Sequence, residues 1–461
     1  MASEKPDLCH VVALPYPGRG HVNPMMNLCK FITRKRENIL ITFVVTEEWL
    51  GFISSNAKHS NIRLASIPNV IPSELVRADD FPGFIQAVRT KMTAPFEELL
   101  DRLELPVTTI LTDAALVWAI HAGNYRNIPV AALRTSPATV FSMLCYLDLF
   151  KQNGHFPVDL SEQGQELVDY IPGIPPIRVA DLPTFFSGDS PTLLRGLLET
   201  LSSLTTAHYL LFNSVYELEA PVFDTLKEKF SIPLYPVGPN IPCFELEDIS
   251  SANSAQSGPD YLEWLNSQPT GSVLYVSMGS FLSASTAQMD AIFAGVINSG
   301  VRYILVARSE TFRFTANHSH LGLVVPWCNQ MKVLCHSSVG GFLTHCGWNS
   351  TLEAVFAGVP MLTFPLFWDQ VTNSKRIVED WKIGWRMKRD AGSNTLTRRE
   401  EISDLVQRFM DPESSDRMEM VKRARKLQDI CQAAVAEGGS SDTNLDAFIG
   451  AISNHPPYQE C

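Results

Sequence analysis

The sequence is short of positive charge and of long apolar runs. Lysine and arginine number 37 against 49 aspartates and glutamates, and the formal net charge is −12. This balance argues against a nucleic acid or an anionic membrane surface as partner. No run approaches the roughly 18 apolar residues that cross a bilayer, and the first residues lack the apolar core and cleavage site of a signal peptide. We therefore expect a cytoplasmic protein without a transmembrane segment.

The sequence also lacks the spacings that hold metal ions. Its nine cysteines are scattered along a long chain, which is typical of free thiols in a reducing compartment. Cys328, Cys335, His336, His345 and Cys346 lie close together in sequence, but no two of these cysteines have the C-x2–4-C spacing of zinc sites. The chain contains no Asp-x-Asp triplet. We therefore predict no metal ligands and no bound cofactor.

Length and the alternation of strand and helix patterns predict two α/β domains. A chain of 461 residues is too long for one ordinary core. Short apolar strands, such as residues 39–46, alternate with helical stretches, which is typical of parallel sheets covered on both faces. A polar, Ser-rich segment interrupts the alternation. We predict an N-terminal domain at 1–240, a linker at 241–260, a C-terminal domain at 261–440, and a final helix within 441–461 that packs back on the N-terminal domain.

The segment between Pro157 and Pro191 departs from the alternating pattern. It is rich in proline, glycine and aromatic residues. Two interpretations are open, an irregular excursion on the surface or a loop that helps to line a binding site. Long loops in compact domains are usually functional or disordered, so composition does not decide between the two.

Polar and aromatic residues are densest between Trp327 and Gln370. Within this stretch, 339–345 is expected to form a buried strand that ends in a glycine turn, 349–358 a helix, and 359–365 the next strand. A helix N-terminus at the end of a parallel strand directs free backbone N–H groups and a positive dipole end at one point. The stretch therefore predicts an anion site, and most anions bound in this way are phosphates.

The same stretch resembles the 44-residue signature of the plant UDP-dependent glycosyltransferases, the family 1 glycosyltransferases. The resemblance rests on its length, from Trp327 to Gln370, on the HCGWNS core at 345–350 and on the closing pair that begins at Asp369. One departure is Asn329, because the family usually has Trp-x-Pro-Gln where this chain reads WCNQ. The departure puts the shape of the local loop in question.

Motifs outside this stretch extend the resemblance to nearly the whole chain. They include PYPGRGHVNP at 15–24 and YVSMGS at 275–280, and the segments at 47–52 and 72–77 resemble the plant subgroup numbered 87. The resemblance implies a fold of the GT-B type, in which two doubly wound Rossmann-like domains face each other across a cleft. It also implies that the N-terminal domain binds the acceptor and the C-terminal domain binds the UDP-sugar.

The resemblance assigns most of the donor site to the signature stretch. Trp327 is expected to stack on uracil, with contacts to the base from the backbone at Cys328 and from Gln330, while Glu353 accepts both ribose hydroxyls. The residues expected to hold the diphosphate are Ser280, His345, Asn349 and Ser350, with Trp348 behind the phosphates and the sugar edge. Asp369 and Gln370 are expected to bind the hexose hydroxyls, and Gln at the last position is associated with glucose.

The expected catalytic groups lie far upstream of the signature stretch. His21 follows the first predicted strand, at the position of the family's catalytic histidine, and Asp113 closes another predicted strand. The carboxyl ends of parallel strands share one edge, so Asp113 is placed to orient His21 and stabilise its protonated form. Thr135 ends a further strand and is a candidate for a sugar contact by the same positional match.

These assignments predict an inverting transferase that needs no metal ion. His21 would take the proton of an acceptor hydroxyl as that oxygen attacks the anomeric carbon of UDP-glucose, and UDP would leave from the opposite face. The product would be a β-O-glucoside of a small lipophilic acceptor, with flavonoids, phenolics, terpenoids and hormones all open. The expected partners are therefore a UDP-sugar and a small molecule, and the acting unit is expected to be a monomer.

Other functions were weighed against this interpretation. An NAD enzyme is disfavoured because the glycine pattern after the first strand has Asn23 where its third glycine would stand. A UDP-sugar sensor without catalysis would keep the signature but lose the His–Asp pair, and both are present. A UDP-sugar epimerase on the same fold stays open until a product is identified.

Overall fold

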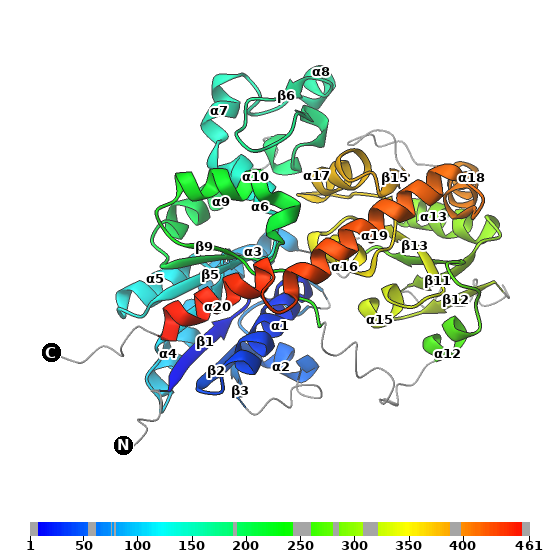
Figure 1. Ribbon diagram of the computed structural model, residues 1–461. Coiled ribbons are helices and arrows are strands. Elements are labelled where there is room, and N and C mark those ends of the chain that lie inside the picture. Colours follow the sequence, from blue (N-terminus) through cyan, green and yellow to red (C-terminus); the bar gives the residue numbers. More distant parts are fainter. Residues whose placement is uncertain are drawn as a thin grey trace.

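The computed structural model shows two α/β domains, each built around a parallel β-sheet with helices on both faces (Figure 1). This architecture is the one that the sequence predicted. The residues that the structure describes are 8–53, 61–74, 76–77, 80–187, 191–242, 260–279, 285–307, 321–387 and 398–453. Within this part of the chain, no helix is both long enough and apolar enough to cross a membrane.

The sheet of the N-terminal domain is parallel throughout. Its described strands, in spatial order, are β3 (Ile62–Ile67), β2 (Ile39–Thr46), β1 (Cys9–Leu14), β4 (Thr109–Asp113), β5 (Val130–Arg134), β8 (Tyr209–Phe212) and β9 (Leu234–Pro236). Every residue of β2 is buried. Apolar, β-branched runs of this kind suit a sheet that helices cover on both faces, and they explain why β2 has the range predicted for it.

The sheet of the C-terminal domain is also parallel. Its described strands, in spatial order, are β12 (Gly322–Val325), β11 (Arg302–Val306), β10 (Val273–Ser277), β13 (Val339–Thr344), β14 (Met361–Thr363) and β15 (Gly384–Arg386). The sequence analysis missed β12 and β15. Both are short edge strands, and three or four residues are too few to show a strand period.

Helices of the N-terminal domain bury a separate apolar cluster against each face of its sheet. These helices are α1 (Arg19–Lys35), α2 (Glu47–Ile53), α3 (Phe81–Lys91), α4 (Thr93–Arg102), α5 (Val117–Tyr125), α6 (Ala138–Cys145), α7 (Leu147–Gln152), α9 (Pro191–Leu204) and α10 (Tyr216–Lys229). Phe84 and Phe141 belong to one cluster, and Met25 and Trp49 belong to the other. The first β-strand and its helix α1 thereby hold the turn before α1 at the carboxyl edge of the sheet.

Helices of the C-terminal domain cover its sheet in the same way. They are α12 (Tyr261–Asn266), α13 (Thr286–Asn298), α15 (Gln330–Leu334), α16 (Trp348–Ala357), α17 (Gln370–Lys375), the π-helical turn η4 (Arg376–Asp380), α18 (Arg399–Met410) and α19 (Ser415–Val435). Val355 of α16 lies in the cluster on one face, and Ile402 of α18 lies in the cluster on the other. The order β13, α16, β14 places the N-terminus of α16 at the carboxyl edge of this sheet.

The last helix, α20 (Ser440–Ser453), lies on the N-terminal domain. The long helix α19 leads to it across the molecule (Figure 1). Phe448 contacts the ring of Tyr209 and is buried in the core of the N-terminal domain. Lys35 of α1 forms ion pairs with Asp442 and Asp446 at 2.6 and 2.9 Å. The chain therefore passes between the two domains twice. It first enters the C-terminal domain, and it returns to the N-terminal domain at α20.

Two stretches with helical spacing are each divided in the structure. Residues 81–103 form α3 and α4, which meet at Met92. Pro95 has no N–H to donate, and its ring would clash with the carbonyl four residues earlier, so one helix cannot run through this point. Residues 138–153 form α6 and α7. The apolar period therefore predicted helical structure here but not the ends of the helices.

The segment after α7 forms a small lobe at the top of the molecule (Figure 1). Its elements are α8 (Leu160–Gln163), the antiparallel pair β6 (Leu167–Val168) and β7 (Ile177–Arg178), and the 3-10 turns η1 (Val179–Asp181) and η2 (Thr184–Ser187). Four charged side chains join it to the C-terminal domain. Arg178 pairs with Asp181 and Glu379 at 2.8 and 2.5 Å, and Arg386 pairs with the same two carboxylates at 2.9 and 3.0 Å. The lobe is therefore ordered structure that bridges the domains.

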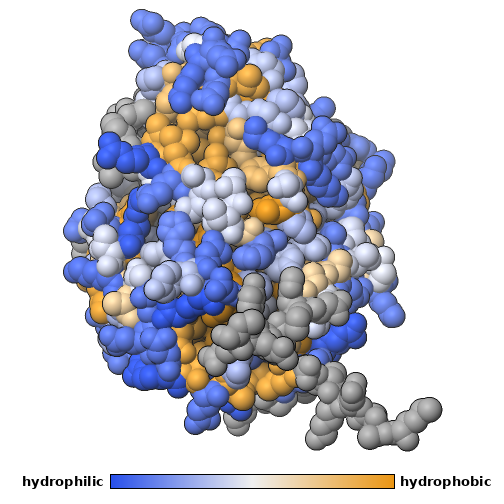
Figure 2. Space-filling model, turned by 90° about the vertical axis from the view of Figure 1, so that its left-hand side faces the viewer, coloured by the Kyte–Doolittle hydropathy of each residue, from blue (hydrophilic) through white to orange (hydrophobic). Residues whose placement is uncertain are grey.

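Hydrophilic side chains cover most of the molecular face shown in Figure 2. Apolar side chains show on this face in separate areas, the clearest of them just below the top of the molecule. Such areas are normal on a folded protein, because polar atoms are too few to cover the whole surface.

Candidate active site

The N-terminus of α16 leaves its first backbone amides without a side-chain cap. The helix begins at Trp348, and its N-cap residue, Gly347, has no side chain to accept from the first turn. The sequence analysis expected the helix to open at Asn349, which lies one residue inside it. Uncapped amides at a positive dipole end favour an anion. The structure thus supplies the donors of an anion site at the predicted strand–turn–helix junction.

Side chains from the same helix end bond directly to the N-terminal domain. Asn349 Nδ2 donates to the carbonyl of Gly20 at 2.6 Å, and Asn213 Nδ2 donates to Asn349 Oδ1 at 2.8 Å. The indole N–H of Trp348 donates to the Asn213 carbonyl at 2.8 Å, so its buried ring lies at the domain contact. Gly20 precedes His21 in the chain. The sequence placed His21 on the turn before the first helix, but it lies in the first turn of α1, and a hydrogen bond joins that turn to the start of α16.

His345 lies between two glycines at the end of β13. A Cβ at Gly279 would lie 2.7 Å from the imidazole, and a Cβ at Gly347 would lie 2.5 Å from its Nε2, so both positions exclude side chains. Gly279 also has a left-handed φ of 83°, which suits glycine. Burial lowers the pKa of His345 to about 4, and its Nδ1 has no hydrogen-bond partner in the described part of the chain. The fourth expected phosphate ligand, Ser280, lies outside the described residues.

Gln330 joins the predicted ribose and phosphate ligands in one hydrogen-bond network. Its Nε2 donates to Ser350 Oγ at 2.9 Å and to Glu353 Oε2, and its Oε1 accepts from the hydroxyl of Tyr275 at 3.0 Å. The contact of Gln330 with uracil stays a prediction, and in the structure the amide of Gln330 bonds to Glu353 and Ser350. Burial raises the pKa of Glu353 to about 7, against the effect of the hydrogen bond from Gln330.

The loop that lacks the usual proline is held by two other contacts. Asn329 has a φ of −74°, which a proline would also adopt, and its side chain caps α15 by accepting from Lys332 N at 3.1 Å. Its own N–H donates to the hydroxyl of Tyr261 at 3.2 Å, a bond that proline cannot make. Beside it Trp327 is 50% exposed, whereas Cys328 is buried. The backbone thus has a proline-like shape at Asn329, and an exposed indole precedes it.

The closing pair of the signature stretch lies at the start of α17. Asn373 Nδ2 donates to Asp369 Oδ2 at 2.9 Å. Gln370 is buried, and its Oε1 accepts from the backbone amides of Leu366 and Phe367 at 2.9 and 3.3 Å. Because these two bonds occupy the oxygen of the Gln370 amide, its NH2 group is the part that can donate to another acceptor.

The carboxyl of Asp369 also interacts with groups from the other domain. Burial raises its pKa, while the hydrogen bond from Asn373 and the charges of Arg134 and His21 act in the opposite direction. Arg134 and His21 both belong to the N-terminal domain. The charges of both residues therefore act on the predicted hexose ligand across the domain boundary.

His21 and Asp113 meet at the carboxyl edge of the N-terminal sheet. His21 Nδ1 lies 2.7 Å from Asp113 Oδ2, and Asp113 Oδ1 accepts from the backbone N–H of Ala115 at 2.9 Å. Thr135 Oγ1 lies 3.0 Å from the same Nδ1, so this residue contacts the histidine. The His21 side chain is 33% exposed, and that of Asp113 is 3% exposed. A buried carboxylate thus holds one nitrogen of a ring whose other nitrogen is left for a ligand.

The sequence analysis missed Arg134, which closes β5 next to Thr135. Its guanidinium lies over the ring of Phe141 at 4.9 Å and donates to Ser136 Oγ at 2.9 Å. Burial lowers the pKa of Arg134, whereas the charges of Asp113 and Asp369 act to raise it. The sequence does contain a signal that could have revealed this position, because Arg134 is a charged residue at the end of an apolar strand. The positive charge of Arg134 and the charges of the two carboxylates therefore act on one another.

In the part of the chain that the structure describes, no group of three or more His, Cys, Asp or Glu side chains is arranged to hold an ion.

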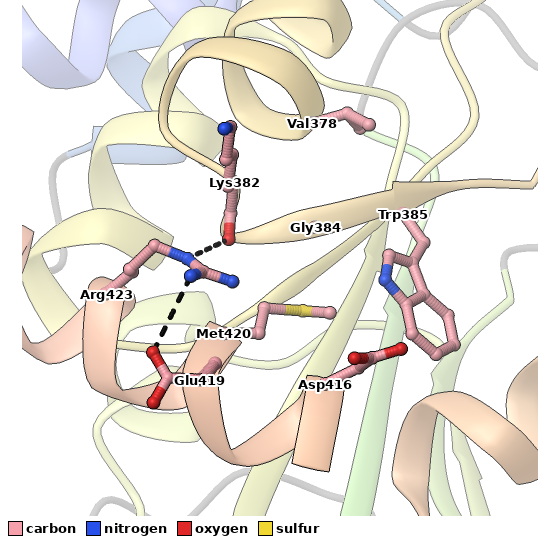
Figure 3. A pocket seen from close by; sticks show the side chains of 8 residues that line it. All are labelled: Val378, Lys382, Gly384, Trp385, Asp416, Glu419, Met420 and Arg423. Atoms are coloured by element: carbon pink, nitrogen blue, oxygen red, sulfur yellow. Dashed lines mark hydrogen bonds and ion pairs between the residues drawn. The ribbon is translucent and has the colours of Figure 1, made fainter. Parts of the chain in front are cut away.

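A hollow of about 340 Å³ lies elsewhere on the C-terminal domain, between β15 and α19 (Figure 3). It is lined by Val378, Lys382, Gly384, Trp385, Asp416, Glu419, Met420 and Arg423. Arg423 donates to the Lys382 carbonyl at 2.9 Å and pairs with Glu419 at 3.7 Å. These polar groups partly satisfy one another, and the residues expected to form the active site do not line this hollow.

The chain resembles known plant transferases in sequence and in fold. Residues 210–398 match the family model described as "UDP-glucoronosyl and UDP-glucosyl transferase". The chain is 49% identical to UDP-glycosyltransferase 87A2 of Arabidopsis thaliana over 96% of its own length and 97% of that relative.

Two solved plant structures share the fold over nearly the whole chain. Os79 from O. sativa in complex with UDP is 27% identical, with a TM-score of 0.81, over 96% of this chain and 100% of that one. UGT71G1 of Medicago truncatula, complexed with UDP-glucose, is 25% identical, with a TM-score of 0.82, over 97% and 98% of the two chains. A parallel two-domain fold, an uncapped helix end within the signature stretch and near-full-length similarity all agree, and the chain belongs to the UDP-glycosyltransferase family.

Proposed function

We propose that the protein transfers glucose from UDP-glucose to a hydroxyl of a small lipophilic acceptor, with inversion at the anomeric carbon. The observation that carries the proposal is the direct bond between the two halves of the site. Asn349 of the donor helix donates to the carbonyl of Gly20, the residue before His21. The relatives that bind UDP and UDP-glucose support the choice of donor. The proposed product is a β-O-glucoside.

The base in this proposal is His21. Its Nδ1–H donates to Asp113, so the lone pair of Nε2 is available to the acceptor hydroxyl. The acceptor oxygen attacks the anomeric carbon, its proton passes to Nε2, and the bond from that carbon to the UDP oxygen breaks on the opposite face. Asp113 stabilises the imidazolium that forms, as the carboxylate does in other His–Asp pairs.

The departing diphosphate is stabilised without a cation in this proposal. The amides at the start of α16 carry the positive end of the helix dipole. His345 is neutral near pH 7 because its pKa is lowered to about 4, so it acts as a hydrogen-bonding ring rather than a charge. Ser280 keeps its predicted role as a hydroxyl donor. Preorganised donors of this kind favour the transition state because they need no rearrangement when the charge develops.

UDP-glucose affinity should depend on pH through Glu353. A carboxylate accepts from both ribose hydroxyls, whereas a protonated carboxyl has one acceptor fewer. Because the pKa of Glu353 is raised to about 7, lowering the pH from 8 to 6 protonates it in the free protein. We expect Kd for UDP-glucose to rise roughly tenfold over this interval, as measured by isothermal titration calorimetry.

The control for this experiment is Glu353→Gln, which cannot titrate. At pH 8 the variant should bind UDP-glucose with a larger Kd than the wild-type protein. This Kd should stay nearly constant as the pH is lowered to 6. UDP-glucose is the ligand of choice because its diphosphate diester does not titrate in this range, unlike the terminal phosphate of UDP. A wild-type Kd that is the same at pH 6 and pH 8 would show that Glu353 is ionised throughout or makes no contact.

Gln370 is proposed to favour glucose among donors. Its oxygen is held by the amides of Leu366 and Phe367, so its NH2 group points to acceptors beyond the turn. A sugar hydroxyl whose orientation differs, as in UDP-galactose, would lose that bond. We expect kcat/KM for UDP-glucose to exceed that for UDP-galactose by about tenfold or more. Equal values for both donors would contradict this role.

One assay tests the proposed function as a whole. Purified protein is incubated with UDP-glucose and a panel of flavonoid, phenolic, terpenoid and hormone alcohols, and the products are identified by mass spectrometry and NMR. A β-glucoside is the expected product, and an α-glucoside would contradict inversion. Binding without turnover would favour a sensor, and UDP-galactose as product would favour an epimerase. The monomeric state and the cytoplasmic location stay predictions from the sequence.

A further inference from the structure

We propose that Trp368 is a specificity-determining residue whose indole, together with Phe81, forms an aromatic wall for a flat, aromatic acceptor. This inference rests on the proposed function and narrows its acceptor class from lipophilic alcohols in general to aromatic ones. It concerns the residue immediately before Asp369, which the sequence analysis gave no role.

The backbone of Trp368 has a conformation that a tryptophan rarely adopts. Its φ is 59°, in the left-handed region where residues other than glycine are uncommon. The surrounding structure keeps it there, because Thr184 N donates to the Trp368 carbonyl at 3.0 Å and Trp368 N donates to Thr184 Oγ1 at 2.8 Å. Thr184 belongs to the lobe of the N-terminal domain. Strain held in place by its surroundings is typical of a functional position.

The indole of Trp368 is exposed although its neighbours in the chain are not. It is 36% exposed, while Gln370 is buried. Its ring lies 5.7 Å from that of Phe81, which comes from the other domain, and 5.8 Å from that of Phe367. A large aromatic surface left open at a contact between domains is the kind of surface that small apolar ligands use.

A row of aromatic rings leads from Trp368 to His21. Phe81 lies 6.4 Å from Phe84, Phe84 lies 6.0 Å from Tyr16, and Tyr16 lies 5.1 Å from the imidazole of His21. Phe84 is buried and backs the row, whereas at its two ends His21 is half-buried and Trp368 is exposed.

The row of rings joins Trp368 to His21 across the contact between the domains, and the charge of His21 acts on the carboxyl of Asp369, the residue after Trp368. An acceptor that stacks on Trp368 and Phe81 would thus lie along the same row of rings as His21, the proposed base. Flat aromatic rings bind such a surface more tightly because they make offset or edge-to-face contacts, which a saturated ring of equal size cannot make. The geometry therefore favours aromatic alcohols over aliphatic ones.

The test compares 2-naphthol with decahydro-2-naphthol, which have the same carbon skeleton. KM and binding are compared rather than kcat, because a phenol is the more acidic alcohol. We expect Trp368→Gly to raise KM for 2-naphthol about tenfold, to change KM for the saturated alcohol far less, and to leave KM for UDP-glucose unchanged. Glycine is chosen because it adopts the left-handed conformation without strain. Trp368→Phe should restore most of the affinity.

Tyr125→Ala is the matched control, because Tyr125 is 85% exposed on α5 and distant in sequence from every predicted site residue. It should leave all three KM values unchanged. An equal rise of KM for both alcohols, or a rise for UDP-glucose alone, would overturn the proposal.

Calorimetry with 2-naphthol and saturating UDP separates this inference from the proposed function. If wild-type protein transfers glucose to no alcohol of the acceptor panel, the proposed function fails, yet weaker binding of 2-naphthol by Trp368→Gly would still support the aromatic wall. Equal binding by the two proteins would overturn the wall even where transfer occurs.

Discussion

Replacing His21 with alanine is expected to lower kcat by about a thousandfold, while the Kd for UDP-glucose stays near its wild-type value. The reason is geometric. His21 Nδ1 is held by Asp113 Oδ2 at 2.7 Å, so the ring presents its other nitrogen as a base. The donor ligands predicted in the signature stretch lie in the other domain and keep their own hydrogen bonds. Steady-state kinetics and calorimetry on the same preparation measure the two quantities.

Asp113→Asn is the informative companion of this substitution. The amide keeps the size of the side chain but cannot stabilise an imidazolium, and we expect a loss in kcat of about a hundredfold or more. Thr135→Val removes the second contact to Nδ1 of His21, and it should lower kcat much less than Asp113→Asn does. A His21→Ala protein that retained near wild-type kcat would show that the base lies elsewhere.

Removing Arg376 should produce the largest change in stability. Arg376 of η4 pairs with Glu219 of α10 at 2.7 Å, and both side chains are buried. Although burial acts to raise the pKa of Glu219, the charge of Arg376 and the bonds from Ser214 and Thr139 hold it below its usual value. Arg376→Met would leave a buried carboxylate without its counter-charge. We expect the free energy of unfolding to fall by about 3–5 kcal/mol, as measured by urea denaturation.

The contacts of Glu219 explain why this pair matters to the whole molecule. Its carboxylate accepts from the backbone amides of Ala138 and Thr139 at 3.0 and 2.9 Å, where α6 begins, and from Ser214 Oγ at 2.6 Å. Arg376 comes from the C-terminal domain, so the pair joins the two domains in their shared interior.

Lys422→Met is the matched control for Arg376→Met, because Lys422 pairs with Glu419 at 3.8 Å and both side chains are exposed. It should leave the urea midpoint unchanged. If the two variants unfolded at the same midpoint, the buried pair would contribute nothing beyond an exposed one.

Local patterns in the sequence were enough for the fold. Runs such as residues 39–46 are apolar and β-branched at nearly every position, and only a strand buried on both faces suits such a run. The order of the signature stretch, strand, glycine turn, helix and strand, also depends on residues close in sequence. Edge strands such as β15 escaped prediction because their pairing, rather than their composition, makes them strands.

The partners of the site residues were predictable only in part. Asp113 was placed near His21 because Asp113 ends one parallel strand and His21 follows another strand of the same sheet, and the carboxyl ends of parallel strands share one edge. Nothing in the sequence indicated that Gln330 would bond to Glu353 and Ser350. The side chain of a glutamine can donate and accept several hydrogen bonds, and the sequence does not say with which partners. The packing of α15 against α16 determines the partners of Gln330.

The sequence by itself determined the family and the two parallel sheets, because these depend on short-range patterns and on one long signature. Only the tertiary structure decided how the domains meet. Asn349 bonds to Gly20 across 329 positions, and Trp368 is held by Thr184 of the lobe. Such contacts depend on the relative position of two separately folded sheets, which no local period encodes. The packing of one domain on the other therefore sets the distance between the proposed donor ligands and the proposed base, and it forms the proposed aromatic wall.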